Sequence, residues 1–126
     1  MKILGSGVDI VEVRRLKQSV RKWGSHFLNK VFTPQELRYV QKKKNRFESL
    51  AARFAVKEAV VKAFGERKDR PAALHQIEVK NTKEGVPQVF LHYPSKTKLI
   101  ISMSHSKEYA VGTAILVAKE RPRKNR

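Results

Sequence analysis

The chain has 126 residues, 40% of them apolar, which is the size and composition of one folded domain with a core of its own. It has no cysteine, no apolar run near the ~20 residues that cross a bilayer and no signal-peptide pattern, which excludes disulfide frameworks and thiolate sites and predicts a cytoplasmic protein rather than a membrane protein. The 28 Lys and Arg residues against 11 Asp and Glu give a net charge of +17, so a polyanionic partner or a phosphorylated ligand is expected.

Residues 2–11 predict an apolar strand that is interrupted by Gly5 and Gly7. Glycine within a strand indicates a bulge or a backbone that another segment approaches closely. Asp9 lies between two apolar residues of this strand, where a carboxylate needs a partner. The sequence leaves three alternatives open for this carboxylate: backbone N–H groups hold it, it binds a cation, or it faces a cleft.

Helical segments follow the strand. Residues 12–23 have apolar residues at helical spacing and basic residues on the other faces, and Gly24 is positioned to end this helix. Residues 25–31 predict one or two further turns. Thr33-Pro34-Gln35-Glu36 starts another helix, because Thr caps it, Pro takes the first helical position and Glu completes a capping box. A basic run at 42–46 links it to the next helix.

The central helix, residues 48–64, is stopped by Gly65, and we expect the site to form around it. Its apolar stripe comprises Leu50, Phe54, Val61 and Phe64, and the edge of the stripe comprises Ala51, Ala55, Glu58 and Lys62. Glu58 and Lys62 form either a solvated i,i+4 pair worth ~0.2–0.5 kcal/mol or a functional pair beside alanines that leave space for a ligand. Lys57 falls inside the apolar stripe and therefore needs a partner.

The second half of the chain has the alternation that is typical of antiparallel strands. Strands are expected in two pairs, 76–81 with 86–92 and 98–104 with 109–117. Helices collect in the first half and strands in the second, which predicts an α+β fold with the helices packed on one face of an antiparallel sheet. We expect a single domain at residues 1–118 and a flexible basic tail at 119–126.

Three elements carry side chains for one site, namely Asp9 on the first strand, Glu58 and Lys62 on the central helix, and the Ser104-His105-Ser106 turn. Two carboxylates without a neighbouring His or Cys fit a hard cation such as Mg²⁺, which takes oxygen ligands and keeps positions open for phosphates. Lys62 would then contact a phosphate oxygen. A glycosidase pair lacks sugar-stacking aromatics, and a triad of Ser102, His105 and Asp9 lacks the Gly-x-Ser-x-Gly turn.

The main alternative is a small basic nucleic-acid-binding module. Such a module would use the basic run at 42–46 and the tail residues 121–126 as phosphate contacts, with aromatic residues stacking on bases. The predicted strands have no ordered aromatic pattern for stacking, and this alternative leaves Asp9 and Glu58 unexplained. Nucleic acid is therefore not the partner that we expect.

Four motifs extend over nearly the whole chain in the order found in a known family. They are Gly7-Val8-Asp9-Ile10, Phe32-Thr33-Pro34-Gln35-Glu36-Leu37, the helix from Leu50 through Lys57-Glu58-Ala59 and Lys62-Ala63 to Gly65, and Ser102-Met103-Ser104-His105-Ser106. With these motifs the chain resembles the holo-(acyl-carrier-protein) synthases, the short single-domain members of the 4'-phosphopantetheinyl transferase superfamily. The resemblance implies transfer of the phosphopantetheine arm of coenzyme A to a serine of apo acyl carrier protein, which releases adenosine 3',5'-bisphosphate.

The resemblance also implies residue roles. Asp9 and Glu58 match the Mg²⁺ ligands, and Glu58 is also suited to orient or deprotonate the attacking hydroxyl. Lys62 matches a lysine that contacts phosphate. The remaining phosphates and the nucleotide would be bound by Arg53, His105 and Lys44. The basic first helix resembles the helix that binds the acidic carrier protein, and its expected contacts are Arg15 and Lys22.

Family members of this length are typically trimers with sites shared between neighbouring subunits, so the resemblance implies a homotrimer. A small half-open sheet agrees with self-association, because its core is limited. The chain departs from the family pattern at residues 66–71, which are charged where the family usually has a glycine-rich uncharged loop. Glu84 also stands where a neutral polar residue is common.

Overall fold

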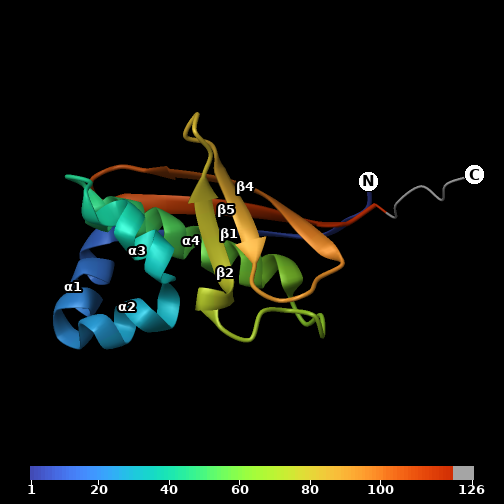
Figure 1. The fold of residues 1–126 in the computed structure, drawn as a ribbon, viewed down its shortest axis with the longest axis horizontal. Coiled ribbons are helices and arrows are strands. Elements are labelled where there is room, and N and C mark those ends of the chain that lie inside the picture. Colours follow the sequence, from blue (N-terminus) through green and yellow to red (C-terminus); the bar gives the residue numbers. More distant parts are fainter. Residues whose placement is uncertain (121–126) are drawn as a thin grey trace, which may run out of the picture.

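The computed structural model describes residues 1–120, which form five strands, four α-helices and a short 3₁₀-helix (Figure 1). In chain order they are β1 Ile3–Glu12, α1 Val13–Trp23, α2 Ser25–Val31, α3 Pro34–Gln41, α4 Arg46–Phe64, η1 Leu74–Gln76, β2 Ile77–Asn81, β3 Pro87–Leu91, β4 Thr97–His105 and β5 Tyr109–Ala118. Every element predicted from the sequence is present. Of the predicted tail, residues 121–126 lie outside the described residues, and the N–H of Lys119 is bonded to the carbonyl of Lys96 at 2.8 Å.

Local sequence signals set the helix ends. The Thr33 hydroxyl accepts the N–H of Glu36 at 3.2 Å and the Glu36 carboxylate accepts the N–H of Thr33 at 2.9 Å, which is the predicted capping box of α3. Gly24 and Gly65 follow α1 and α4 with φ values of 57° and 58°, which glycine adopts without strain. None of the described helices is long and apolar enough to cross a membrane.

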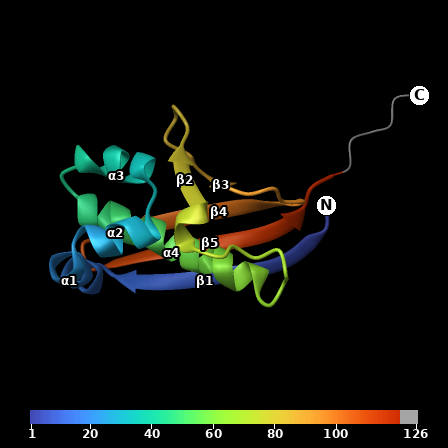
Figure 2. The same ribbon diagram turned by 60° about the horizontal axis from the view of Figure 1, so that its bottom comes forward.

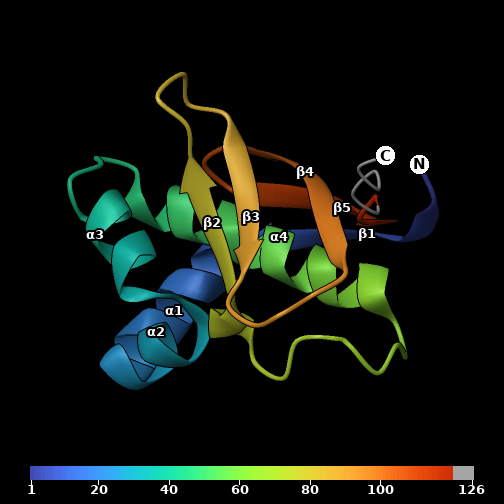
Figure 3. The same ribbon diagram turned by 45° about the vertical axis from the view of Figure 1, so that its right-hand side comes forward.

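The strands form two sheets rather than one. β1, β5 and β4 form a three-stranded antiparallel sheet in which the first strand of the chain pairs with the last, so that Asp9 lies opposite Gly112. β2 and β3 form a separate hairpin, and β3 runs beside β4 (Figure 3). The α+β prediction and both predicted strand pairs are confirmed, while the expected single sheet is divided in two.

Helix α4 lies across one face of the three-stranded sheet, and α1, α2 and α3 gather at one end of it (Figure 2). Buried Val56 and Val60 of α4 pack in one core with Leu116 of β5 and Ile77 of the hairpin. Burial on α4 extends beyond the predicted apolar stripe and includes Ala51 and Ala55 at its edge, because neighbouring elements cover most of the helix. Glu58 and Lys62 lie in the small part of it that remains accessible.

The alanines of α4 pack against glycines of the sheet. A Cβ atom on Gly7 would overlap the carbonyl oxygen of Ala59, and one on Gly112 would overlap the backbone at Ala55 and Val56. Glycine in the strands thus lets the two backbones come into direct contact. The prediction of a close approach at Gly7 is confirmed, whereas the prediction that the alanines leave space for a ligand is wrong, because the sheet fills that space.

Gly7→Ala is expected to lower the free energy of unfolding by more than about 2 kcal/mol, because the added methyl group must push β1 away from α4. Urea denaturation followed by circular dichroism measures this change. Ser6→Ala is the matched control, since Ser6 is the exposed neighbour on the same strand. Equal stability of the two variants would contradict the direct backbone contact.

Candidate active site

The predicted carboxylates and lysine meet where β1 passes over α4. Lys62 donates hydrogen bonds from Nζ to Asp9 Oδ1 at 2.9 Å and to the carbonyl of Val8 at 3.0 Å. Its ion pair therefore joins the helix to the strand, and the alternative of a solvated pair between Glu58 and Lys62 is not what the structure contains. The Lys62 side chain is 55% exposed, so this ammonium remains accessible to a ligand.

Glu58 and Asp9 line one groove between β1, α1 and α4. The other residues that line it are Ile10, Val11 and Glu12 of β1, Arg15, Leu16 and Ser19 of α1, and Phe54 of α4. Burial raises the pKa of the Glu58 carboxyl above its usual value, the negative charge of Asp9 raises it further, and Lys62 opposes both. Two carboxylates that repel one another across an open groove are an arrangement that a bound cation would stabilise.

Replacing Asp9 with asparagine is expected to lower the pKa of Glu58 in the metal-free protein, because it removes a negative charge that favours the protonated carboxyl. Nuclear magnetic resonance titration of the Glu58 side-chain carboxyl in both proteins measures the shift. An unchanged or higher pKa in the variant would mean that the two carboxylates are electrostatically independent.

The donor set of the groove fits a hard cation. Asp9 and Glu58 offer carboxylate oxygens alone, and within residues 1–120 no group of three or more His, Cys, Asp or Glu side chains gathers in a metal-ligating arrangement. A cation held by these two residues would therefore keep coordination positions for water and for ligand oxygens. That is the coordination which Mg²⁺ prefers in phosphate-binding sites.

Arg53 makes its contacts within the fold, and its phosphate-binding role stays a prediction. It is buried, with Nη2 donating to Asn81 Oδ1 at 2.6 Å and Nη1 donating to the carbonyl of Ser49 at 3.3 Å, and its guanidinium stacks over the Tyr39 ring. The guanidinium is thus engaged within the fold and is not presented in the groove of Glu58. Through Asn81 it supports the turn that joins β2 to β3, where the Asn81 amide also donates to the carbonyl of Gly85 at 3.2 Å.

His105 ends β4 and lies in a neighbouring hollow. Its Nδ1 is 3.1 Å from Glu48 Oε1, a partner on α4 that sequence patterns did not reveal. The hollow is bordered by Ile10 of β1, which also borders the groove of Glu58. The alternative of a catalytic triad is contradicted, because His105 pairs with Glu48, Asp9 pairs with Lys62, and Ser102 Oγ is bonded to Thr113 Oγ1 at 2.6 Å.

The remaining predicted contacts lie on the helical end of the molecule. Arg15 is exposed on α1 and lines the same groove as Asp9 and Glu58. Lys22 is exposed at the end of α1, with Nζ 5.0 Å from the centre of the Trp23 ring. Lys44 is exposed in the turn between α3 and α4. Phe54, assigned to the core from periodicity alone, is a groove residue that the sequence analysis missed.

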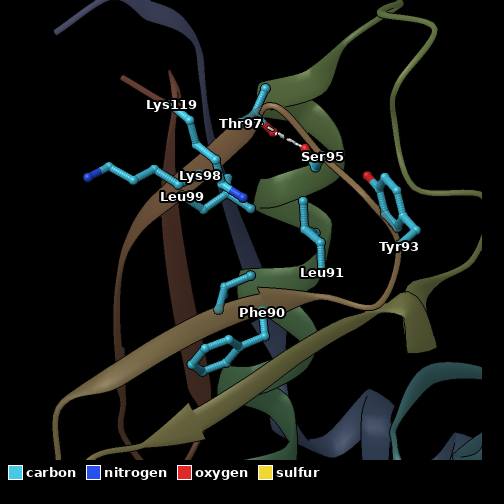
Figure 4. A pocket seen from close by; sticks show the side chains of 9 residues that line it. Phe90, Leu91, Tyr93, Ser95, Thr97, Lys98, Leu99 and Lys119 are labelled. Atoms are coloured by element: carbon cyan, nitrogen blue, oxygen red, sulfur yellow. Dashed lines mark hydrogen bonds between the residues drawn. The ribbon is translucent and has the colours of Figure 1, made fainter. Parts of the chain in front are cut away.

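A separate hollow between β3 and β4 holds none of the predicted residues (Figure 4). Leu91 and Leu99 point into it from facing strands, and Ser95 and Thr97 close one end through a 2.6 Å hydroxyl pair. It lies at the start of β4, the opposite end from His105. Because it has neither a carboxylate nor a histidine, the groove of Glu58 is the better candidate for chemistry.

Residues 5–114 match the family model of the 4'-phosphopantetheinyl transferase superfamily. The chain belongs to this superfamily. The matched range contains Asp9, Glu58, Lys62 and His105, so the phosphopantetheinyl transferase match covers both the groove and the neighbouring hollow. The family resemblance seen in the sequence motifs is confirmed.

Curated phosphopantetheinyl transferases with similar sequences are named holo-(acyl-carrier-protein) synthases. The protein from Dehalococcoides mccartyi strain CBDB1 is 44% identical over 94% of this chain and 100% of its own length. The protein from Thermodesulfovibrio yellowstonii is 48% identical over 90% of this chain and 98% of its own length. The crystal structure of a holo-(acyl-carrier-protein) synthase from Bacillus anthracis in complex with CoA (3',5'-ADP) covers 95% of this chain and 100% of that one, with 31% identity and a TM-score of 0.80.

Proposed function

We propose that this protein transfers the 4'-phosphopantetheine group of coenzyme A to a serine of apo acyl carrier protein, as the holo-(acyl-carrier-protein) synthase of fatty acid biosynthesis. The products are holo acyl carrier protein and adenosine 3',5'-bisphosphate. The observation that carries the proposal is the groove lined by Asp9 and Glu58, with Lys62 paired to Asp9, within a chain that matches this superfamily over residues 5–114. Holo-(acyl-carrier-protein) synthases similar in sequence over nine-tenths of the chain support the substrate assignment.

Asp9 and Glu58 are proposed to hold Mg²⁺. Their oxygen-only donor set and the raised pKa of Glu58, caused by burial and then by Asp9, support this assignment. When bound, Mg²⁺ neutralises charge on the pyrophosphate of coenzyme A. The exposed ammonium of Lys62 offers a second positive charge to the same phosphates, as a point charge that does not require a fixed bidentate geometry.

During transfer, the serine Oγ forms a bond to the phosphorus that carries the pantetheine arm. The bond from that phosphorus to the bridging oxygen breaks, and adenosine 3',5'-bisphosphate leaves with the electron pair. Glu58 accepts the serine proton, directly or through a water molecule. Positioning and charge neutralisation supply most of the rate enhancement in such transfers.

Basic residues outside the carboxylate pair are proposed to contribute to binding coenzyme A and the carrier protein. His105 and Lys44 would contact the nucleotide end of coenzyme A, and Arg53 would act indirectly by holding Asn81. Arg15 and Lys22, both exposed on α1, would contact the acidic carrier protein. Arg15 also lines the groove of Glu58, so a carrier bound there would bring its serine to the carboxylates.

The protein is proposed to act as a homotrimer. The face of the three-stranded sheet that α4 leaves uncovered carries apolar side chains with large exposed fractions, namely Val8 at 56%, Ile10 at 67%, Ile100 at 45% and Ile115 at 37%. Several large exposed apolar side chains on one sheet face, here with Ser6, Thr113 and Ser102 among them, are typical of a subunit interface. Because Ile10 also borders both the groove of Glu58 and the hollow of His105, a subunit on this face would lie against the site.

Intact-mass spectrometry of an apo acyl carrier protein tests the function. With this protein, coenzyme A and Mg²⁺, the carrier is expected to gain the mass of one phosphopantetheine arm, and EDTA is expected to prevent the gain. No gain with several apo carriers, by a folded protein that binds coenzyme A, would contradict the proposal. A nucleic-acid-binding module would instead bind oligonucleotides with an affinity that falls steeply with salt.

A further inference from the structure

Lys57 is a fully buried cation one residue before Glu58. Its side chain has no exposed area, and Nζ donates to Glu36 Oε1 at 2.6 Å, to the carbonyl of Val31 at 2.7 Å and to the carbonyl of Leu74 at 3.3 Å. These acceptors belong to α3, to the end of α2 and to η1. The three protons of one ammonium therefore connect α4 to three other segments.

Glu36 extends this connection. Its side chain is also fully buried, and besides Lys57 its carboxylate accepts the N–H of Thr33 at 2.9 Å and the N–H of Val79 in β2 at 2.9 Å. Every hydrogen-bonding direction of the ammonium and both carboxylate oxygens are thus used. The ion pair fixes α4 against α2, α3, η1 and β2 in one arrangement.

Stability alone does not account for such a pair. Removing two ions from water carries a large desolvation penalty, and apolar side chains of similar volume often hold a fold together as well or better. Apolar packing tolerates shifts of one element along another, whereas hydrogen bonds to an ammonium require defined directions. Compared with apolar side chains, Lys57 and Glu36 additionally restrict the rotation of α4 about its own axis.

That orientation decides whether the site residues meet. Glu58 and Lys62 project from α4, while Asp9 projects from β1, so their separation depends on the rotation of the helix. With side-chain atoms about 5–6 Å from the helix axis, a rotation of about 20° would move the Glu58 carboxylate by about 2 Å. A displacement of about 1 Å is enough to cost about 10²-fold in rate at a catalytic site.

We propose that Lys57 and Glu36 are positioning residues that set the rotation of α4, and with it the distance of Glu58 and Lys62 from Asp9. Neither side chain lines the groove, and both act through the helix and its neighbours. This inference rests on the proposed function, because it concerns the geometry of the same carboxylate pair. It assigns to Lys57 a positioning role, which differs from the phosphate-binding role proposed for Lys62.

Lys57→Met is the main test, since methionine has a similar length and no charge. In the folded variant we expect kcat to fall about 10²-fold while KM for the carrier protein changes less than about threefold, because α1 is not displaced. A second readout does not depend on activity: the affinity for Mn²⁺ alone, measured from the free-ion signal in electron paramagnetic resonance, is expected to fall about tenfold, in the range that supporting residues give.

Leu50→Ala is the matched control. Leu50 is buried on the same helix at 4% exposure, and its truncation lowers stability without removing an atom of the ion pair. It is expected to leave kcat and Mn²⁺ affinity of the folded protein unchanged. If Lys57→Met does not fold, Glu36→Gln carries the test, because it keeps the side-chain shape while removing the charge, and both kcat and Mn²⁺ affinity are expected to fall.

Wild-type kcat and Mn²⁺ affinity in folded Lys57→Met, or in Glu36→Gln where it replaces that variant, would overturn the inference. Equal losses in Leu50→Ala would also overturn it, because they would assign the effect to stability. A wild-type protein that transfers no phosphopantetheine would contradict the proposed function instead. In that case the Mn²⁺ measurements would still decide whether the ion pair positions the two carboxylates.

Discussion

Replacing Glu58 with glutamine is expected to lower the rate of phosphopantetheine transfer by about 10³-fold or more, because one side chain supplies both a metal ligand and the acceptor of the serine proton. Glutamine keeps the shape and most of the packing of Glu58, but its neutral amide does not accept the proton and is a weaker metal ligand than a carboxylate. The time course of the carrier mass gain measures the rate, and circular dichroism verifies the fold.

Glu66→Gln is the control for this variant. Glu66 lies just beyond the end of α4 on an exposed loop, and the same chemical change there is expected to leave the rate within about twofold of wild type. A Glu58→Gln protein that retains a tenth or more of the wild-type rate would remove Glu58 from the chemistry. Asp9 and Glu12 would then be the remaining carboxylates of the groove.

Local signals in the sequence predicted the elements well because each depends on a few neighbouring residues. The capping box at Thr33 and Glu36 and the helix ends at Gly24 and Gly65 formed as expected. The convergence of Asp9 with Glu58 and Lys62 was also predicted, from chemistry that requires two carboxylates together. The pairing of β1 with β5 was not predicted, since strand partners far apart in the chain leave no local signal.

Long-range partners explain the errors as well. The alanines of α4 carry the same pattern whether a ligand or a sheet approaches them, and only the fold reveals that Gly7 and Gly112 occupy the space. The phosphate-binding role of Arg53 stays a prediction, but the sequence did not identify Asn81 and Ser49 as the partners of its guanidinium. The sequence pattern indicated that Lys57 needs a partner, but it did not identify Glu36 as that partner.

The charged loop after α4 shows how a departure from the family pattern is accommodated. Arg67 pairs with Asp69 at 3.0 Å, and Arg70 donates to the carbonyls of Glu66 and Arg67 at 3.3 and 3.1 Å. The Tyr93 hydroxyl donates to the carbonyl of Asp69 at 2.9 Å, which ties this loop to the segment before β4. Ion pairs and hydrogen bonds within the loop thus define its shape without the glycines that the family usually has at this position.

Ile115→Glu is expected to convert the proposed homotrimer into a monomer. Ile115 lies on the central strand of the three-stranded sheet, directly opposite Ile100 of β4, in the middle of the exposed apolar face. A carboxylate buried there in each subunit would cost several kcal/mol per copy, more than a small interface supplies. Light scattering after gel filtration is expected to give about three times 14.5 kDa for wild type and 14.5 kDa for the variant.

Loss of assembly is also expected to abolish transfer, because the groove of Glu58 and the hollow of His105 both border Ile10 at the edge of the same face. Gln88→Glu adds the same charge to an exposed position on β3, away from this face, and is expected to remain trimeric and active. A monomeric Ile115→Glu protein with full activity would confine the whole site to one subunit. A trimeric one would instead assign the interface to another surface, and the apolar face would then need a different partner.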